Sequence, residues 1–227
     1  MSKLFAINGS PQTEKGHTAL LLSAFLKGAE EAGATVELVY PDRLDINPCA
    51  CSQMYCWNKK PGECCIVDEM QVLYPKLKAS NILVLATPVY IPLPGAIQNM
   101  INRLVPLFEP ELVFRSGRTR ARLRPDVAIK SVALVVTSGW WEKENCDTVV
   151  RIVREFAEDA SLPFAGALVR PHSSYMKRAG KLTTEGEAVL DAARQAGREL
   201  IQKHAISPAL LEKISHPLIS REDYWKD

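Results

Sequence analysis

The stretch NGSPQTEKGHT, which follows the first apolar run of the chain, has the composition of a phosphate-binding loop. Ser10 and Thr18 offer hydroxyl groups, and Gly9 and Gly16 allow backbone N–H groups to turn inward. The helix expected after the loop adds free N–H groups and the positive end of its dipole. Because Lys15 is the one Lys or Arg in this loop, such donors would meet most of the charge. This suits a terminal phosphate monoester held without a metal.

Two known phosphate-binding motifs do not match this loop, and one structural alternative remains. It is not a Walker loop, because no Gly-Lys-Ser/Thr ends it, and its glycines do not form the Gly-x-Gly-x-x-Gly dinucleotide pattern. The alternative to a phosphate cradle is a polar connection from strand to helix, with ordinary capping by Thr18 or its neighbours.

Apolar, β-rich runs alternate with helical patterns along the chain. The runs lie at residues 3–8, 35–40, 81–87, 130–138 and 163–170, and the helical patterns at residues 18–33, 68–80, 95–108, 147–160 and 183–205. We expect Asp68 to cap the second helix and Gly33 to end the first. Thr184 and Glu187 should open the last helix. This alternation predicts an α/β fold, a doubly wound five-stranded parallel sheet with helices on both faces.

Ligands of such sheets bind beyond the carboxyl ends of the strands, so the loops after strands one, three and four are the candidates. The loop TPVYIPLPG after the third strand is stiffened by three prolines. Its Tyr90 offers a flat ring that could lie along a planar heterocycle. The alternative is a proline-rich turn with Tyr90 packed on the core.

The loop TSGWWEKENC after the fourth strand carries two adjacent indoles, Trp140 and Trp141. Two exposed indoles are costly, which indicates a ring ligand or a subunit interface. The alternative is a hydrophobic plug under the loop. One phosphate-type loop and two aromatic loops at one sheet edge together predict a phosphorylated flavin.

Bulk properties limit the classes of function. A chain of 227 residues with a net charge of +2 gives no strong case for nucleic acid or membrane. No apolar run reaches the roughly 18 residues of a membrane helix, and MSKLFAI is too short for the apolar core of a signal peptide. We expect a cytoplasmic protein. In a reducing compartment, five cysteines between Cys49 and Cys65 indicate metal or redox chemistry more than disulfides.

The chain resembles the flavodoxin-like NAD(P)H-dependent FMN reductase and iron–sulfur flavoprotein family. The resemblance is carried by NGSPQTEKGHTALLL, INPCACSQMYCWNKKPGECCIVDEM, ATPVYIPLPGAIQNMINRL and VVTSGWWEKENCDTVV. It implies a flavodoxin fold with strand order 2-1-3-4-5, bound FMN, and a homodimer or homotetramer that completes each flavin pocket. We expect a flavin domain at 1–205, with a cysteine-rich loop at 47–67. The apolar residues of 206–227, which follow the last expected helix, indicate a C-terminal arm at a subunit interface.

The resemblance also implies the residues that contact the cofactor. The FMN phosphate would be held by Ser10, Gln12, Gly16, His17 and Thr18. The isoalloxazine and ribityl chain would be lined by Thr87, Pro88, Val89, Tyr90 and Ile91, and the other ring edge covered by Ser138, Gly139 and Trp140. The chain departs from the family where it has His17 before Thr18 in place of Asn. It also has Gln98 and Asn102 in place of a helical Lys and Asp.

The cysteine spacing is a further departure, since the family's first thiolates stand at two-residue gaps. A [4Fe–4S] cluster needs four converging thiolates, which could come from Cys49, Cys51, Cys56 and Cys64, with Cys65 spare. Zinc could use the same sulfurs, but Cys51 and Cys56 are the one neighbouring pair with the usual Cys-x2–4-Cys spacing, and a second such pair is missing. The third reading is an ordered loop whose cysteines are free or form a redox pair. The single residue between Cys49 and Cys51 makes a cluster geometrically tight, so the ordered loop without a metal is favoured over a cluster. A cluster is in turn favoured over zinc because of the pair spacing.

The basic run RSGRTRARLR at residues 115–124 could attract the 2′-phosphate of NADPH or an acidic protein donor. The alternative, which is favoured because charge runs are usually solvated, is a surface excursion that packs across a subunit interface.

Three functions from different classes are then open. The first is an FMN-dependent oxidoreductase that takes electrons from NAD(P)H and gives them to free flavin, quinone or another small acceptor. The second is an electron carrier fed by ferredoxin through an iron–sulfur cluster, whose partner is a small redox protein. The third is a flavin-binding regulatory module.

Overall fold

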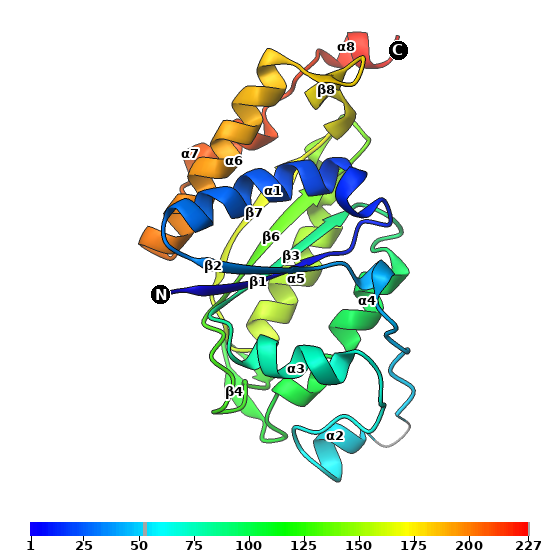
Figure 1. The fold of residues 1–227 in the computed structure, drawn as a ribbon, viewed down its shortest axis with the longest axis vertical. Coiled ribbons are helices and arrows are strands. Elements are labelled where there is room, and N and C mark those ends of the chain that lie inside the picture. Colours follow the sequence, from blue (N-terminus) through cyan, green and yellow to red (C-terminus); the bar gives the residue numbers. More distant parts are fainter. Residues whose placement is uncertain (52–53, 227) are drawn as a thin grey trace.

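A five-stranded parallel sheet forms the centre of the structure, a computed structural model that describes residues 1–51 and 54–226. Residues 52–53 of the predicted cysteine-rich loop and residue 227 of the predicted arm lie outside the described residues. The strands are β1 (Lys3–Asn8), β2 (Thr35–Val39), β3 (Ile82–Pro88), β6 (Ser131–Thr137) and β7 (Phe164–Arg170). Their order, β2-β1-β3-β6-β7, confirms the predicted 2-1-3-4-5 arrangement (Figure 1).

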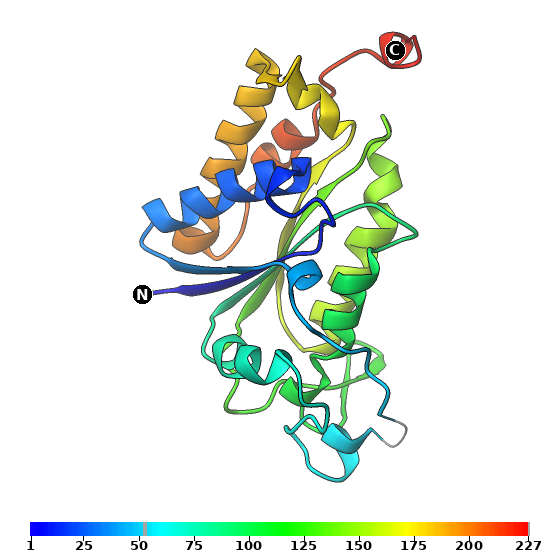
Figure 2. The ribbon, with the colours of Figure 1, turned by 45° about the vertical axis from the view of Figure 1, so that its right-hand side comes forward.

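Helices cover both faces of the sheet because the strands are apolar on both faces (Figure 2). In β3, Leu83 and Leu85 pack toward one layer, and Val84 and Ala86 toward the other, all fully buried. The first layer contains α3 (Met70–Lys78), α4 (Gly95–Asn102) and α5 (Asp147–Asp159). The second contains α1 (His17–Glu31), α6 (Thr184–Lys203) and α7 (Pro208–Ser215).

Several short elements lie outside this framework and were not predicted. They are the helices α2 (Tyr55–Asn58) and α8 (Arg221–Tyr224), and the hairpins β4 (Val113–Arg115) with β5 (Arg118–Arg120) and β8 (Lys177–Arg178) with β9 (Lys181–Leu182). Single 3-10 turns occur at Thr13–Lys15, Pro41–Arg43, Val105–Leu107, Lys143–Cys146 and Ser173–Met176.

The single helix predicted over residues 95–108 is wrong. The helix α4 ends at Asn102, and the chain then forms a 3-10 turn at Val105–Leu107. Pro106 accounts for the break, because proline lacks an N–H and disfavours helical geometry at the residue before it.

Two predicted helix starts also shift, while one predicted end is confirmed. The Asp68 carboxylate accepts from the N–H of Met70, but it also binds Arg103, and α3 begins after Glu69. The last helix is capped by Thr183, not Thr184, because Thr183 is extended and its hydroxyl accepts from the N–H of Gly186 at 2.9 Å. Gly33 takes a φ of +89° directly after α1, as expected of a terminating glycine.

The helices α1 and α6 cross in direct main-chain contact. A Cβ atom on Gly28 would lie 1.8 Å from the carbonyl oxygen of Arg194, and one on Gly197 would lie 1.9 Å from that of Phe25. Glu31 accepts hydrogen bonds from Arg194 and Arg198 beside this crossing. Any side chain at either glycine would therefore force the two helices apart.

The segment predicted as a C-terminal arm begins by packing on its own chain. The helix α7 contacts β7 and α6, and its Ile214 is fully buried. The remainder reaches α8 near the carboxyl ends of the strands (Figure 1). Its place at a subunit interface stays a prediction.

Candidate functional site

One pocket at the carboxyl edge of the sheet brings the three predicted loops together. Its volume is about 240 Å³, and it lies at the strand-order switch where flavodoxin-like folds bind ligands. Most of the predicted cofactor residues line it: Ser10, Gln12, Gly16, His17, Thr18, Pro88, Val89, Tyr90, Ser138 and Gly139. Thr87, Ile91 and Trp140 do not.

The phosphate-type loop leaves the start of α1 without a side-chain cap. The N-cap residue of α1 is Gly16, and no side chain accepts from the first turn. Thr18 does not cap the helix, because its hydroxyl is hydrogen-bonded to that of Thr137 at 2.7 Å. The helix therefore presents N–H groups and its positive dipole end to the pocket. The alternative of a connection with ordinary capping by Thr18 does not fit this geometry.

The side of this loop nearest the strand is held by short hydrogen-bonded turns. The side chain of Asn8 accepts from the N–H of Ser10 at 3.0 Å, and the Ser10 hydroxyl accepts from the N–H of Gln12 at 3.3 Å. The Nδ2 group of Asn8 is buried and has no hydrogen-bond partner in the described part of the chain. A Cβ on Gly16 would lie 3.0 Å from the Ser10 hydroxyl, so a larger residue there would crowd the cradle.

His17 stands half-buried at the first position of α1. Burial, and then the charge of Lys177, lower the pKa of His17 below its ordinary value. The imidazole is therefore neutral at pH 7 and can donate one hydrogen bond to an anion without adding charge.

The two adjacent tryptophans have separate environments. Trp140, which follows the lining residue Gly139, is 58% exposed, and Tyr90 is 52% exposed, so neither is packed on the core. Trp141 instead donates from Nε1 to the Ile219 carbonyl and stacks on His172. The plug reading fits Trp141, whereas Trp140 and Tyr90 are open for contact with a planar ligand.

The loop after β7 contributes pocket residues that the sequence reasoning missed. Ser173 and Ser174 line the pocket, as does Thr137 at the end of β6. The N–H of Ser173 donates to the Ser138 carbonyl at 2.9 Å, which joins this loop to the one after β6. The signal was available, since the paired serines stand three and four residues after the end of the fifth apolar run, at the same sheet edge.

A buried network fixes the segment after α7 against the pocket loops. Arg170 is fully buried and donates to the carbonyls of Ile214 and His216. His172 accepts from the N–H of Leu218 at 3.0 Å, and burial followed by the Arg170 charge lowers the pKa of His172 to about 4. His172 therefore stays neutral and serves as an acceptor.

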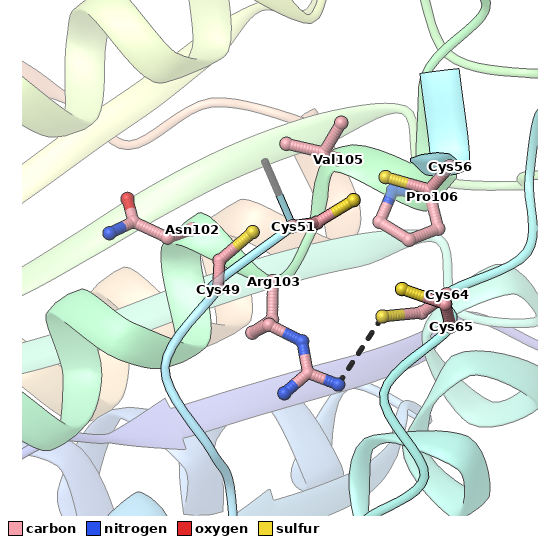
Figure 3. Close-up of a pocket in the computed structure, with 9 residues that line it drawn as sticks. All are labelled: Cys49, Cys51, Cys56, Cys64, Cys65, Asn102, Arg103, Val105 and Pro106. Atoms are coloured by element: carbon pink, nitrogen blue, oxygen red, sulfur yellow. Dashed lines mark hydrogen bonds between the residues drawn. The ribbon is translucent and has the colours of Figure 1, made fainter. Parts of the chain in front are cut away.

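Five cysteines face one small cavity below the sheet. Cys49 and Cys51 lie opposite Cys56, Cys64 and Cys65, and their sulfurs point into the shared space (Figure 3). The cavity is about 10 Å³, room for about one water molecule. No group of three or more His, Cys, Asp or Glu in the described ranges 1–51 and 54–226 is arranged to hold a metal ion. The donor type fits an iron–sulfur cluster, but the enclosed volume does not.

A buried ion pair anchors this cysteine loop. The side chains of Arg103 and Asp68 are both fully buried and lie 2.6 Å apart at their closest polar atoms. Arg103 also donates to the Asn47 carbonyl at 2.7 Å and to the Cys64 sulfur at 3.4 Å (Figure 3). Burial raises the pKa of the Cys56 thiol to about 11, so Cys56 is protonated at neutral pH.

The basic run at residues 115–124 is matched by carboxylates of its own chain. It forms the β4–β5 hairpin, where Arg120 binds Glu155, Glu158 and Asp159 of α5. Arg118 pairs with Glu155, and Arg122 with Glu109 and Glu111. Arg115 donates to the Glu158 carbonyl and, within the described residues, is the cation of this run that has no carboxylate partner.

The five-stranded parallel sheet, with this site at its strand-order switch, has a flavodoxin-like fold. The chain belongs to the NADPH-dependent FMN reductase family, whose sequence profile matches residues 2–155.

Among the described residues, no helix is long and apolar enough to cross a membrane.

Curated relatives match parts of the chain. It is 31% identical over 108 residues to an iron–sulfur flavoprotein of Methanocaldococcus jannaschii, covering 48% of this chain and 52% of that protein. It is 29% identical over 142 residues to an iron–sulfur flavoprotein of Archaeoglobus fulgidus, covering 60% of this chain and 59% of that protein. The chain thus spans about half the length of the curated relatives it matches.

Solved structures share the fold over most of the chain. The NAD(P)H:quinone oxidoreductase from Methanothermobacter marburgensis has a TM-score of 0.60 at 15% identity, covering 88% of this chain and 98% of that one. An FMN-dependent NADH-azoreductase from Bacillus anthracis in complex with FMN has a TM-score of 0.59 at 14% identity, covering 90% and 100%. At these identities the likeness shows the fold alone.

Proposed function

We propose that this protein is an FMN-dependent oxidoreductase that takes electrons from NAD(P)H and passes them to a flavin, quinone or other small acceptor. One observation carries the proposal: the uncapped start of α1 opens into a pocket at the sheet switch point, beside the Ser10 and Thr18 hydroxyls. This arrangement suits a phosphate monoester. The family profile and the name of the B. anthracis azoreductase support FMN as the bearer of that phosphate.

The roles of the residues follow from where they lie. Ser10, Gln12, Gly16, His17 and Thr18 would hold the phosphate, and the pocket position of Ser173 and Ser174 adds two hydroxyls on the opposite wall. Thr87, Pro88, Val89, Tyr90 and Ile91 would line the ring and ribityl chain, with Ser138, Gly139 and Trp140 at the other edge. Bound there, FMN would supply hydride acceptance and one- or two-electron transfer, while the protein supplies position and hydrogen-bond donors.

The test is a spectrum and an anaerobic reduction. We expect the purified protein to bind FMN with micromolar or tighter affinity and to bleach on addition of NADPH or NADH. A protein that stays colourless in excess FMN would contradict the proposal. If bound flavin is not reduced by NADPH or NADH, and passes no electrons to small acceptors, the result would point to a regulatory module.

Replacing Trp140 should have a moderate effect on the affinity for FMN. Trp140→Ala should raise the Kd for FMN about fivefold to tenfold, because one aromatic contact contributes about 1 kcal/mol beyond area burial. Titration followed by flavin fluorescence measures this. Phe114→Ala is the matched control, since Phe114 is an aromatic residue 80% exposed on β4, away from the pocket residues. Equal Kd values for the two variants would contradict a ring contact at Trp140.

The second candidate is an iron–sulfur electron carrier that accepts electrons from ferredoxin. The observation that favours it is the set of five cysteines facing one cavity, together with the names of both curated relatives. Because the cavity is about 10 Å³, a cluster needs the cysteine loop in a different arrangement.

Anaerobic reconstitution with iron and sulfide tests this candidate. A carrier should retain about four iron atoms per chain, and Cys56→Ser should lose most of them. Cys146→Ser is the control, because Cys146 lies away from the cavity, is fully buried, and its pKa is raised by burial to about 12. Iron below one atom per chain in the unaltered protein would reject the second candidate.

We also propose a cytoplasmic homo-oligomer, a homodimer or homotetramer, in which the arm at residues 206–227 meets a neighbouring subunit. The exposed apolar side chains at the pocket rim, Tyr90, Ile91 and Trp140, support a partner surface there. Sedimentation equilibrium would contradict this by giving a monomer at micromolar concentration.

A further inference from the structure

A second groove lies directly beside the flavin pocket. It has a volume of about 780 Å³ and is lined on one side by the β8–β9 hairpin and on the other by residues 218–219, Asp223 and Lys226. Ser174 lines both this groove and the flavin pocket. Asp223 lines the other wall, and the hydroxyl of the adjacent Tyr224 donates to the Gly139 carbonyl at 3.1 Å, which ties that segment to a flavin-pocket loop. The two cavities therefore share the wall residue Ser174, and the segments that border them are linked by the Tyr224–Gly139 hydrogen bond.

The hairpin side of this groove carries cations without carboxylate partners. Lys177 and Arg178 line it, both are exposed, and within the described residues neither forms an ion pair. Lys226 on the opposite wall is paired with Asp223, and Glu185 is the other acidic residue of the lining. The positive charge of β8 is thus left to attract an anion.

The basic run at residues 115–124, which contains the β4–β5 hairpin, can be compared with Lys177 and Arg178 as a site for an anionic ligand. There, Arg118, Arg120 and Arg122 are all neutralised by carboxylates of α5 or of the preceding loop. Its cations do not line the flavin pocket or the groove beside it. Charge alone pointed to residues 115–124, whereas pairing and position point to β8.

The β8–β9 hairpin is held firmly in place. Ala179 and Gly180 form its turn with φ values of +50° and +79°, a geometry that matches the twist of a two-residue hairpin. The base packs on the first turn of α6, where a Cβ on Gly186 would lie 2.2 Å from the Met176 carbonyl oxygen. Lys177 and Arg178 therefore stand on a scaffold fixed relative to the flavin pocket.

We propose that this groove binds the phosphate groups of the pyridine dinucleotide donor, with Lys177 and Arg178 as their cationic contacts. The inference rests on the proposed function. A groove of this size can hold the adenosine and pyrophosphate portion of a dinucleotide. A donor whose phosphates lie on the hairpin would extend past Ser174 toward the loop of Gly139, which is expected at the edge of the flavin ring.

The test is anaerobic bleaching of the FMN-loaded protein at increasing NADPH, which separates the Kd for the donor from the limiting rate. Lys177→Ala with Arg178→Ala should raise the Kd for NADPH about tenfold, as expected for loss of charge-assisted contacts, and leave the limiting rate within about twofold. Raising the ionic strength should weaken NADPH binding in the unaltered protein more than in this variant.

Arg118→Ala with Arg122→Ala is the charge-matched control and should change the Kd for NADPH by less than about twofold. Dithionite, a donor without an organic phosphate, should bleach all the proteins equally. An unchanged Kd in the Lys177/Arg178 variant, or an equal rise in the control variant, would overturn the proposal. A Kd for FMN weakened by more than about tenfold would also overturn it, by assigning these cations to the flavin phosphate.

Failure of the groove proposal can be distinguished from failure of the proposed oxidoreductase function. If NADPH fails to bleach the unaltered protein, the oxidoreductase proposal loses its donor, and the groove is tested by calorimetry with 2′-phospho-ADP-ribose. Binding to the unaltered protein that weakens about tenfold in the Lys177/Arg178 variant supports the groove. Absence of binding to the unaltered protein rejects it.

Discussion

Gly16→Asp is expected to raise the Kd for FMN at least about a hundredfold. A Cβ at Gly16 points toward the Ser10 hydroxyl at 3.0 Å, so an aspartate there carries its carboxylate into the phosphate cradle. Two like charges about 5 Å apart repel by about 3 kcal/mol at an effective dielectric constant of about 20, and a phosphate dianion doubles this. A flavin fluorescence titration measures the Kd, and far-UV circular dichroism checks that the variant is folded.

Gly16→Asn is the matched control, because asparagine has almost the same shape without the charge. The φ of −77° at Gly16 is open to any residue, so both substitutions leave the backbone unstrained. Gly16→Asn should weaken FMN binding only through crowding, by about tenfold or less. If the two variants bind FMN equally, the phosphate does not lie at the start of α1.

Asp68→Asn is expected to lower the free energy of unfolding by about 3–5 kcal/mol at pH 7. The substitution leaves the fully buried Arg103 guanidinium without its counter-charge, and a buried charge whose partner is removed is strongly destabilising. Because Arg103 also holds the Asn47 carbonyl and Cys64, the cysteine loop should loosen with it. Urea unfolding followed by circular dichroism gives the free energy.

Glu37→Gln is the control, since it removes one partner of an exposed pair with Lys76. Exposed pairs contribute about 0–1 kcal/mol, so this variant should unfold nearly as the unaltered protein does. A loss below about 1 kcal/mol for Asp68→Asn would show that the buried pair is not a structural anchor.

The effect of Asp68 should depend on pH in one direction. Burial raises the pKa of Asp68, but hydrogen bonds from Arg103 and from the N–H groups of Asn47 and Met70 outweigh it and leave the pKa below its ordinary value. Its stabilisation is then complete above the unfolded pKa of about 3.9 and is lost as pH falls through the folded value. The difference between Asp68→Asn and the unaltered protein should therefore shrink below about pH 4.

The sheet was predictable because its strands are buried on both faces. Apolar runs such as the one that forms β3 leave few alternatives, and each helical pattern between them has one apolar stripe. The errors lie where a local signal was outweighed. Pro106 ended a helix that apolar periodicity had extended, and Asp68 was taken as a cap although its main partner is Arg103. That pairing joins residues 35 positions apart, a relation that no local pattern contains.

The position of the pocket was predictable from the sequence, but the environment of some of its side chains was not. Its three loops follow strands, so topology alone brings them to one edge. The difference between Trp140 and Trp141 was not readable, because it depends on the Ile219 carbonyl and His172, which are distant in sequence. The same holds for Lys177 and Arg178, whose lack of carboxylate partners in the described part of the chain becomes visible only in three dimensions.

The contact between α1 and α6 has a consequence for how this protein could change over evolution. The loop before α1 carries the cradle and the hairpin before α6 carries the two unpaired cations, so both stand on helices whose main chains touch at Gly28 and Gly197. The distance between the two helices is therefore set by main-chain contact and not by side chains that could be replaced. Substitution at either glycine would push the two helices apart and change the distance between the two anion-binding ends. New donor preferences are therefore more accessible through the length and charge of the hairpin itself.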